Sequence, residues 1–437
     1  MKISLAYGQG HLPVELPDGL TTIIAPSHAP GLPDERGAVL AALEKPIAAR
    51  PLREWIRPGN SVCILFTDIT RATPNDRLIP WLLEHLADVP SRSITLLNQL
   101  GTHRPNTPSE LEQMLTRPVV RQYRVLNHEP ENREALVPLG TTHDGTPALL
   151  NRHFVEADVR IVTGFIEPHF FAGFSGGPKG IMPGVAGLQT VMSNHGARNL
   201  GDPNATFGIT QGNPLWEEIR DIALRPGPSF LLNVSLNERR QITGVFAGDL
   251  IGAHRAGCEF VRQCAMQKFA APFDIVLTTN SGYPLDQNLY QGVKGMSAGA
   301  RVLKPGGTLI LACECRDGLP ANCGYDQILR SAAGPEELLA LISAPGFSRP
   351  DQWSAQIQAL IQRRAHVLLH SSLPDDLVRA AHLTPCHDIS AAVSKLLGGF
   401  PDGARIAVLP QGPLTIPYLA DRGTVGGGCR GGEHESV

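Results

Sequence analysis

Short apolar runs that alternate with amphipathic segments constrain the fold of this 437-residue chain more than any other feature. Three such runs, at 61–66, 93–98 and 159–163, have the length and composition of buried strands, and helical character lies between the first two. Short strands that alternate with helices indicate a mostly parallel sheet. The sequence therefore predicts an α/β fold.

The same pattern predicts two domains. We expect an N-terminal α/β domain over residues 1–270 that binds a cofactor, and a smaller α/β domain over 273–400 that closes over it. A late strand at 404–412, within 404–420, is expected to return to the first domain. The Gly-rich polar tail 421–437 is expected to be disordered. The other expected elements are two strands in 1–25, helices at 36–57, 80–86, 291–302, 335–343 and 351–364, and strands in DIVLTT and GGTLILACEC.

Composition and charge exclude several classes of function. The net charge of -3 offers no basic field for nucleic acid or an anionic membrane. The N-terminus lacks the apolar core of a signal peptide, and no apolar run reaches the roughly 18 residues that span a bilayer. The eight cysteines include no CxxC pair, so we expect a cytoplasmic protein. Cys313 and Cys315 would share one face of a strand, either as buried thiols or as metal ligands.

Three polar loops, at 67–75, 101–107 and 164–187, each follow a predicted strand. In open α/β sheets, ligands bind beyond the carboxyl ends of the strands. We therefore expect the three loops to converge on one crevice, which would lie between the two domains.

The segment 164–195 contains most of the side chains that could take part in catalysis or bind a ligand. Its many glycines would let backbone N–H groups approach a ligand closely, often a phosphate. The P-loop pattern GxxxxGK[ST] is absent, which argues against an ordinary ATPase. His169, Lys179 and His195 exceed what close packing of a glycine loop on a sheet requires, although packing alone remains an alternative, as does a structural role for His195.

The two shorter loops carry candidates of their own. His103 follows a strand end, where a histidine can act as general acid or base, or can stabilise a turn. Asp68, Thr70 and Arg71 combine an acceptor, a hydroxyl and a guanidinium, which suits ribose hydroxyls with a phosphate or carboxylate. The alternative for this loop is a turn that begins at the aspartate and leaves the arginine exposed.

In the second unit, Tyr290, Gln291 and Lys294 lie at helical spacing. The amide and the ammonium could hold a substrate carboxylate. A solvated helix start is the alternative.

Taken in order, these motifs resemble the nickel-dependent lactate racemase family, whose members use the nickel-pincer nucleotide. The resemblance runs from about residue 5 to residue 420. It rests on DITR, GTHRP, EPHFFAGFSGG-x-K, the PG-x-AG-x-x-T run ending in NH, GNP at 212–214, FAGD with AHR at 246–255, YQGVKG, and DQW at 351–353.

The resemblance implies a role for each residue of the central segment. Lys179 matches the lysine that tethers the cofactor through a thioamide, and His195 matches the histidine that completes the nickel coordination. His103 and His169 match the paired proton donors and acceptors. The remaining implied residues are a nucleotide-binding loop of Asp68, Ile69, Thr70 and Arg71, a substrate clamp of Tyr290, Gln291 and Lys294, and an aromatic wall at Trp353.

The resemblance also implies the reaction, which is racemisation or epimerisation of a small 2-hydroxy acid. One base removes the hydroxyl proton while hydride leaves carbon for the cofactor, the planar 2-keto acid rotates, and hydride returns to its other face. Enzymes that build the cofactor would be the maturation partners. No nucleic acid or membrane partner is expected.

The chain departs from the family pattern at a few positions. Pro178 and Gly180 replace the usual arginine and serine around Lys179, so the contacts beside the cofactor and its covalent tether come into question there. Ala72 stands where the family has proline, and Ile69 stands where a lactate-type member carries a polar or basic residue. A substrate other than lactate is therefore expected, such as malate, 2-hydroxyglutarate, an aryl-lactate, a short aliphatic hydroxy acid or a sugar acid.

Two other functions fit the residues alone. The first is a His-rich metal-dependent hydrolase or lyase with His103, His169 and His195 around zinc, although no HExxH motif is present. The second is a non-catalytic protein that binds a nucleotide or a hydroxy acid.

Overall fold

A six-stranded sheet forms the centre of the first half of the molecule. The computed structural model describes residues 1–27, 29–319, 324–401 and 403–419 of the chain. The sheet has the order β13-β12-β9-β4-β5-β6 and is parallel except for the β12–β13 pair. Its strands are β4 (Val62–Phe66), β5 (Ile94–Asn98), β6 (Arg124–Asn127), β9 (Val159–Phe165), β12 (Phe230–Leu236) and β13 (Ile242–Asp249).

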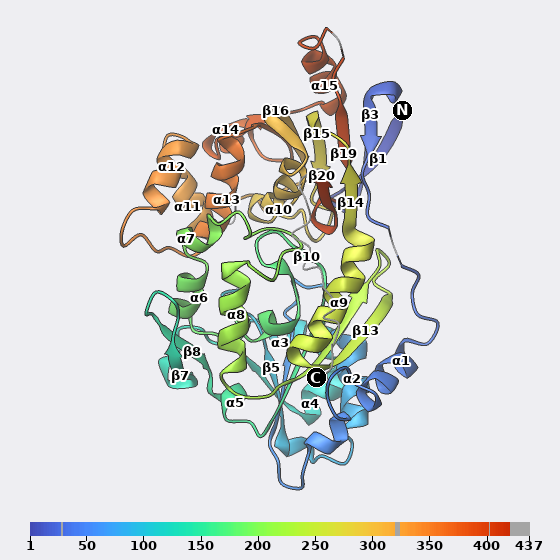
Figure 1. Cartoon of the computed structure of the whole chain (residues 1–437), viewed down its shortest axis with the longest axis vertical. Helices are drawn as coiled ribbons and strands as arrows, with labels where there is room; N and C mark the ends of the chain where they lie inside the picture. Colours follow the sequence, from blue (N-terminus) through green and yellow to red (C-terminus); the bar gives the residue numbers. More distant parts are fainter. Residues whose placement is uncertain (28, 320–323, 402, 420–437) are drawn as a thin grey trace, which may run out of the picture.

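Helices cover this sheet in the lower half of Figure 1. Every residue of β4 is buried, as expected for a strand in a sheet that is covered on both faces. The helices are α1 (Glu35–Glu44), α2 (Asn75–His85), α3 (Pro108–Leu115), α4 (Arg117–Gln122), α5 (Arg152–Val155), α6 (Leu188–Asn194), α7 (Ala197–Leu200), α8 (Pro214–Leu224) and α9 (Leu250–Ala265).

The second half is built on another six-stranded sheet, which is parallel throughout and has the order β18-β17-β16-β15-β19-β3. Its strands are β3 (Thr21–Ile23), β15 (Phe273–Thr279), β16 (Leu303–Ala312), β17 (His366–His370), β18 (Thr384–Pro385) and β19 (Ile406–Leu409). Its helices are α10 (Leu289–Ala300), α11 (Gly324–Arg330), α12 (Pro335–Ile342), α13 (Gln352–Gln362), α14 (Asp375–Ala380) and α15 (Ile389–Leu397).

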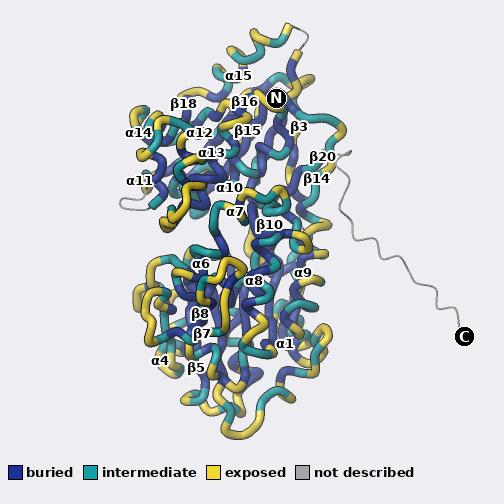
Figure 2. Tube along the Cα trace, turned by 60° about the vertical axis from the view of Figure 1, so that its left-hand side comes forward, coloured by how far each residue is buried: buried dark blue, intermediate teal, exposed yellow. Residues whose placement is uncertain are grey.

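Four pairs of short strands complete the described fold. Three pairs are antiparallel, and β14 and β20 pair in parallel. The pairs are β1 (Lys2–Tyr7) with β2 (Gly10–Glu15), β7 (Leu136–Thr141) with β8 (Pro147–Asn151), β10 (Pro168–His169) with β11 (Gly173–Phe174), and β14 (Met266–Phe269) with β20 (Ile416–Leu419). Figure 2 shows buried chain running through both halves and exposed segments on the outside.

The strand order of the first sheet locates a ligand site. From β4 the chain moves outward to β5 and β6, and it then returns to place β9 on the other side of β4. A crevice opens at such a switch point, beyond the carboxyl ends of the strands. The loops that follow β4, β5 and β9 are the three polar loops of the sequence, so they lie next to one another at this edge.

Several predicted elements need correction. The helix expected at 36–57 ends at Glu44, because Pro46 and Pro51 cannot continue it, and only the 3-10 turn Leu52–Trp55 follows. The helix expected from residue 80 begins at Asn75, so Pro80 lies inside α2 and not in its first turn.

Three further expectations have distinct outcomes. The late strand does not return to the first sheet, because β19 pairs with β15 and β3 of the second. The predicted disordered tail lies outside the described residues. The described helices include none that is both long and apolar enough to cross a membrane.

Candidate active site

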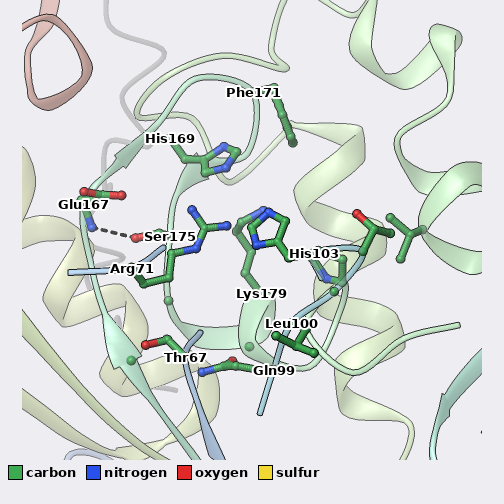
Figure 3. A pocket seen from close by; sticks show the side chains of 18 of the residues that line it. Thr67, Arg71, Gln99, Leu100, His103, Glu167, His169, Phe171, Ser175 and Lys179 are labelled. Atoms are coloured by element: carbon green, nitrogen blue, oxygen red, sulfur yellow. Dashed lines mark hydrogen bonds between the residues drawn. The ribbon is translucent and has the colours of Figure 1, made fainter. Parts of the chain in front are cut away.

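The main cavity of the described structure lies between the two halves of the molecule. The loops after β4, β5 and β9 form one side, and α10 and the start of α13 form the other. Figure 3 shows the basic and imidazole side chains that turn into this space. Nine of the residues proposed from the sequence line it, namely Arg71, His103, His169, Lys179, His195, Tyr290, Gln291, Lys294 and Trp353.

Asp68, Ile69 and Thr70 were expected to bind the nucleotide but are not among the residues that line the cavity. Ile69 packs against the apolar cluster of the first sheet, and the N–H of Thr70 donates to Oδ1 of Asp68 at 2.7 Å. Arg71 is therefore the one member of this predicted set that faces the cavity.

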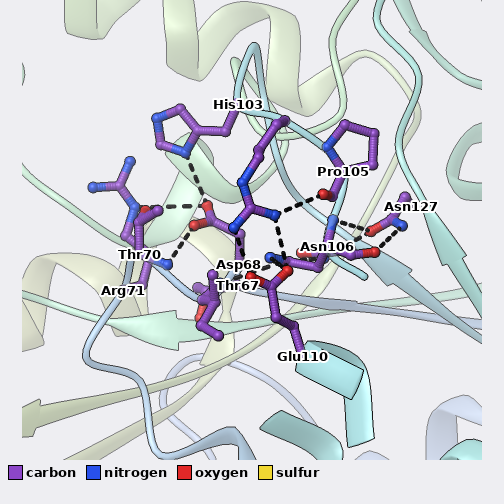
Figure 4. A network of polar contacts seen from close by, with 12 residues as sticks. Thr67, Asp68, Thr70, Arg71, His103, Pro105, Asn106, Glu110 and Asn127 are labelled. Atoms are coloured by element: carbon purple, nitrogen blue, oxygen red, sulfur yellow. Dashed lines mark hydrogen bonds and ion pairs between the residues drawn. The ribbon is translucent and has the colours of Figure 1, made fainter. Parts of the chain in front are cut away.

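Asp68 orients His103 (Figure 4). Its carboxylate is buried, and Oδ2 lies 3.1 Å from Nδ1 of His103 and 4.0 Å from Nε of Arg71. Burial alone would raise the pKa of Asp68, but the hydrogen bond and charge of His103 and the charge of Arg71 hold it well below its usual value. The ionised carboxylate of Asp68 accepts a hydrogen bond from the Nδ1–H of His103. Nε2 of the neutral ring then carries a lone pair.

Arg104, the neighbour of His103, does not enter the cavity. Its guanidinium donates to both carboxylate oxygens of Glu110, at 2.9 and 2.6 Å. Glu110 in turn forms a capping box with Thr107 at the start of α3. This network fixes the loop that carries His103.

His169 has the opposite arrangement. The short hairpin of β10 and β11 places its ring against Phe170 and Phe171. The backbone N–H of Ala172 donates to Nδ1 at 3.3 Å, so the neutral ring carries its proton on Nε2. Burial, followed by the positive charges of Lys179, Lys294 and Arg71, lowers the pKa of His169 well below its usual value. At rest His103 thus offers an acceptor, and His169 offers a donor.

Lys179 extends from the 3-10 turn Gly177–Gly180 into the cavity, with Nζ 5.4 Å from the ring centre of Phe171. Burial and the charges of Arg71 and Lys294 lower its pKa to about 7. A large fraction of the amine is therefore unprotonated near neutral pH, as a nucleophilic lysine requires.

His195 ends α6 with its ring between Phe171 and Trp353, at centroid distances of 5.1 and 5.2 Å. Burial and the charge of Lys179 lower its pKa to about 3. Nδ1 is buried and has no hydrogen-bond partner. A neutral imidazole with an unsatisfied buried nitrogen suits a metal ligand, because leaving such a group unpaired is costly.

The three histidines do not form a metal site by themselves. Within residues 1–27, 29–319, 324–401 and 403–419, no three His, Cys, Asp or Glu side chains are placed to hold a metal ion. The described residues therefore do not form the three-histidine zinc site of the hydrolase or lyase alternative. Cys313 and Cys315 are buried thiols with their Sγ atoms 3.4 Å apart. A metal at His195 would need further ligands from a cofactor.

The second half of the molecule supplies the opposite wall. Nε1 of Trp353 donates to Oη of Tyr290 at 2.8 Å, which joins α13 to α10. Lys294 lies one helical turn beyond Tyr290. Burial and the charge of Arg71 lower its pKa to about 8, and the carboxylate of Glu167 opposes that shift. A cation and an amide on one helix face can hold a carboxylate.

Comparison with known proteins identifies the family. Residues 7–208 match the lactate racemase N-terminal domain, and residues 268–416 match the lactate racemase C-terminal domain. The chain belongs to the lactate racemase family. The family that the sequence motifs resemble is thereby confirmed.

Relatives of this family cover almost the whole chain. A lactate racemase from Thermoanaerobacterium thermosaccharolyticum is 34% identical over 422 residues, which are 95% of this chain and 98% of the relative. One from Lactiplantibacillus plantarum is 36% identical over 382 residues, covering 86% and 90% of the two chains. The structure of the T. thermosaccharolyticum lactate racemase apoprotein matches with a TM-score of 0.90 and 33% identity, over 96% of this chain and all of that one. The α/β fold with two domains is confirmed.

A Thermotoga maritima protein of known structure shares the fold, with a TM-score of 0.67 and 23% identity. It covers 90% of this chain and 100% of its own.

Sequence reasoning missed several residues of the site. Thr67 and Gln99 line the cavity directly after β4 and β5, where the rule on strand ends could have found them. Glu167 lies inside the EPHFFAGFSGG motif but was given no role. His254 and Asn233 bind the backbone of the glycine loop. His254 is part of the AHR motif but was given no role, and no local signal links either residue to the loop, because they lie 79 and 56 residues from the backbone atoms that they bind.

Proposed function

We propose that this protein is a racemase or epimerase of a small 2-hydroxy acid. The observation that carries the proposal is the pair of histidines in one cavity, with His103 preset as proton acceptor and His169 as donor. They face a clamp of Gln291 and Lys294 from the other domain. The names of the two curated relatives, both lactate racemases, support the reaction class.

We further propose that a nickel-pincer nucleotide occupies the cavity, and the residues present fit it. The lowered pKa of Lys179 suits covalent attachment, and the unpartnered buried nitrogen of His195 suits a metal ligand. Arg71 provides positive charge for a phosphate. The backbone at Gly176 also lines the cavity, and a glycine there lets backbone N–H groups approach a phosphate closely. When bound, the group would take up and return a hydride.

The side chains of the protein would then bind, orient and move protons. Lys294 and Gln291 hold the carboxylate, so that the hydroxyl carbon keeps one position while the rest of the substrate turns about it. Nε2 of His103 accepts the hydroxyl proton of one enantiomer. When the oxygen lies on the other side, the Nε2–H of neutral His169 donates a hydrogen bond to it, and protonated His103 returns the proton that it took, so both rings end the turnover as they began. Trp353 and Phe171 keep water away from this step.

Production of the protein together with cofactor-building enzymes, followed by a racemisation screen over 2-hydroxy acids, tests the proposal. We expect one nickel per chain and an added mass that Lys179→Ala abolishes. Lys268→Ala is the control, because Lys268 is an exposed lysine that does not line the cavity. Racemisation by protein that carries neither nickel nor added mass would refute the cofactor, and full loading without racemisation would refute the reaction.

A further inference from the structure

The loop that presents Lys179 packs against His254, a histidine of α9 that lies 79 residues from Ser175 in the sequence. Nε2 of His254, in α9, donates to the backbone oxygen of Ser175 at 2.9 Å. Gly177 lies directly against this ring, and a Cβ at that position would overlap its atoms. The loop therefore runs across the face of His254 with no side chain in between.

A second anchor holds the same loop from β12. The N–H of Gly177 donates to Oδ1 of Asn233 at 2.8 Å, and a Cβ on Gly176 would overlap that oxygen. Both glycines have positive φ, 74° and 53°, which side chains rarely adopt. The N–H of Lys179 then donates to the oxygen of Gly176 at 3.1 Å, so the two anchors determine where the lysine begins.

His254 is itself held firmly. Its ring is 1% exposed and stacks on Trp216 at an interplanar angle of 13°. Burial lowers its pKa to about 4, the bond to Ser175 opposes this shift, and the charge of Lys179 adds to it. The ring is therefore neutral near neutral pH and keeps the donor proton on Nε2.

We propose that His254 is a positioning residue that aligns the amine of Lys179 for covalent attachment of the nucleotide, an inference that rests on the proposed function. In that attachment the amine nitrogen bonds to a thiocarboxyl carbon, whose oxygen leaves as water with one proton from the amine and one from the thiol. Nothing is oxidised or reduced. The contribution of His254 is geometric, because it touches the backbone of the loop and not the reacting atoms.

Two variants separate the hydrogen bond from the ring. His254→Phe keeps an aromatic ring against Trp216 and removes the donor, whereas His254→Gln keeps a donor for the oxygen of Ser175. After maturation, intact mass gives the fraction of chains that carry the nucleotide. We expect that fraction to fall about ten-fold or more in His254→Phe, because a small displacement of a reacting group greatly lowers the rate of its reaction. We expect it to recover largely in His254→Gln.

A second measurement needs no cofactor. Hydrogen exchange of the peptide 173–181 in the apoprotein reports on the anchors directly, and His128→Phe is a matched control. His128 is likewise 1% exposed and bonds the oxygen of Ala186 through Nε2 at 2.9 Å, but Ala186 lies outside the peptide 173–181. We expect faster exchange at the amides of Gly177 and Lys179 in His254→Phe, and wild-type exchange there in His128→Phe.

Several outcomes would overturn the inference. They are full loading and unchanged exchange in His254→Phe, no recovery in His254→Gln, or equal loosening of the loop in His128→Phe. If His254→Phe does not fold, Asn233→Ala must show the same loss of nucleotide and of protection. If the wild type carries no nucleotide at all, the proposed function fails, and the exchange measurement still decides whether His254 anchors the loop.

Discussion

At the scale of single residues, the site depends on which nitrogen of each histidine carries a proton. A carboxylate sets the proton on Nδ1 of His103, and a backbone N–H leaves it on Nε2 of His169. The two rings are therefore not equivalent, although the sequence pattern presents them as a pair. The partner of each ring decides its role.

Asp68→Asn tests this assignment. The amide of the variant would donate to Nδ1 of His103 and move its proton to Nε2, so that the ring no longer accepts the hydroxyl proton. We expect kcat to fall by about 10²–10⁴-fold with little change in KM, by analogy with the loss of an orienting carboxylate elsewhere. Steady-state racemisation of the loaded enzyme measures both.

Asp158→Asn is the matched control for Asp68→Asn, because Asp158 accepts hydrogen bonds from Ser61 just before β9 and β4, at the opposite end of these strands from the cavity. A wild-type kcat in Asp68→Asn would show that the carboxylate does not set the proton on His103.

At the scale of secondary structure, one helix start carries most of the proposed substrate clamp. Asn288 caps α10 and accepts the N–H of Gln291 at 3.0 Å. The first two turns of this helix hold Tyr290, Gln291 and Lys294. Fraying of those turns would move the clamp without altering the histidines.

Asn288→Ala should therefore weaken substrate binding more than chemistry. Loss of the cap costs about 1 kcal/mol of folding free energy, and we expect KM to rise several-fold while kcat changes less. Asp388→Ala removes the equivalent cap of α15 and is the control, because Asp388 does not line the cavity and its loss should lower stability by a similar amount and leave KM unchanged. Urea unfolding and steady-state kinetics give both values. Equal KM effects in the two variants would contradict the argument.

The sequence predicted individual elements better than their assembly. β4, β5 and β9 could be found because their apolar runs are local, and the motif residues could be placed because the loops after these strands meet at one edge. The sheet to which β19 belongs could not be predicted in this way, because the sequence of a short parallel strand does not show which other strands it will pair with. The contact of Asp68 with His103 could not be read either, since a motif shows which residue is present and not which partner it binds.

For the molecule as a whole, buried histidines should link stability to pH. His128 and His254 have their pKa lowered to about 4 and His195 to about 3, chiefly by burial. The unfolded chain, with histidine pKa near 6.5, binds more protons than the folded chain between about pH 6.5 and pH 4. The free energy of unfolding therefore has its full value above pH 6.5 with respect to these histidines, and it falls as the pH decreases from 6.5 to 4.

Each of these histidines contributes about 1.4 kcal/mol per pKa unit, so together they should destabilise the apoprotein by several kcal/mol at pH 4.5 relative to pH 7.5. Urea unfolding over this range measures the effect. His128→Gln should give a shallower dependence on pH, because it removes one of the titrating groups. Equal stability of the wild type at the two pH values would contradict the prediction.

Both ends of the chain contribute to one sheet, since β3 near the N-terminus pairs with β19 near the C-terminus. The first sheet and its helices lie between them as one continuous stretch. On the ribosome, the half that holds Lys179 is complete once α9 has emerged, whereas the half that holds Lys294 must wait for nearly the last strand. The half that carries Lys179 can thus fold while the half that carries Lys294 is still being synthesised.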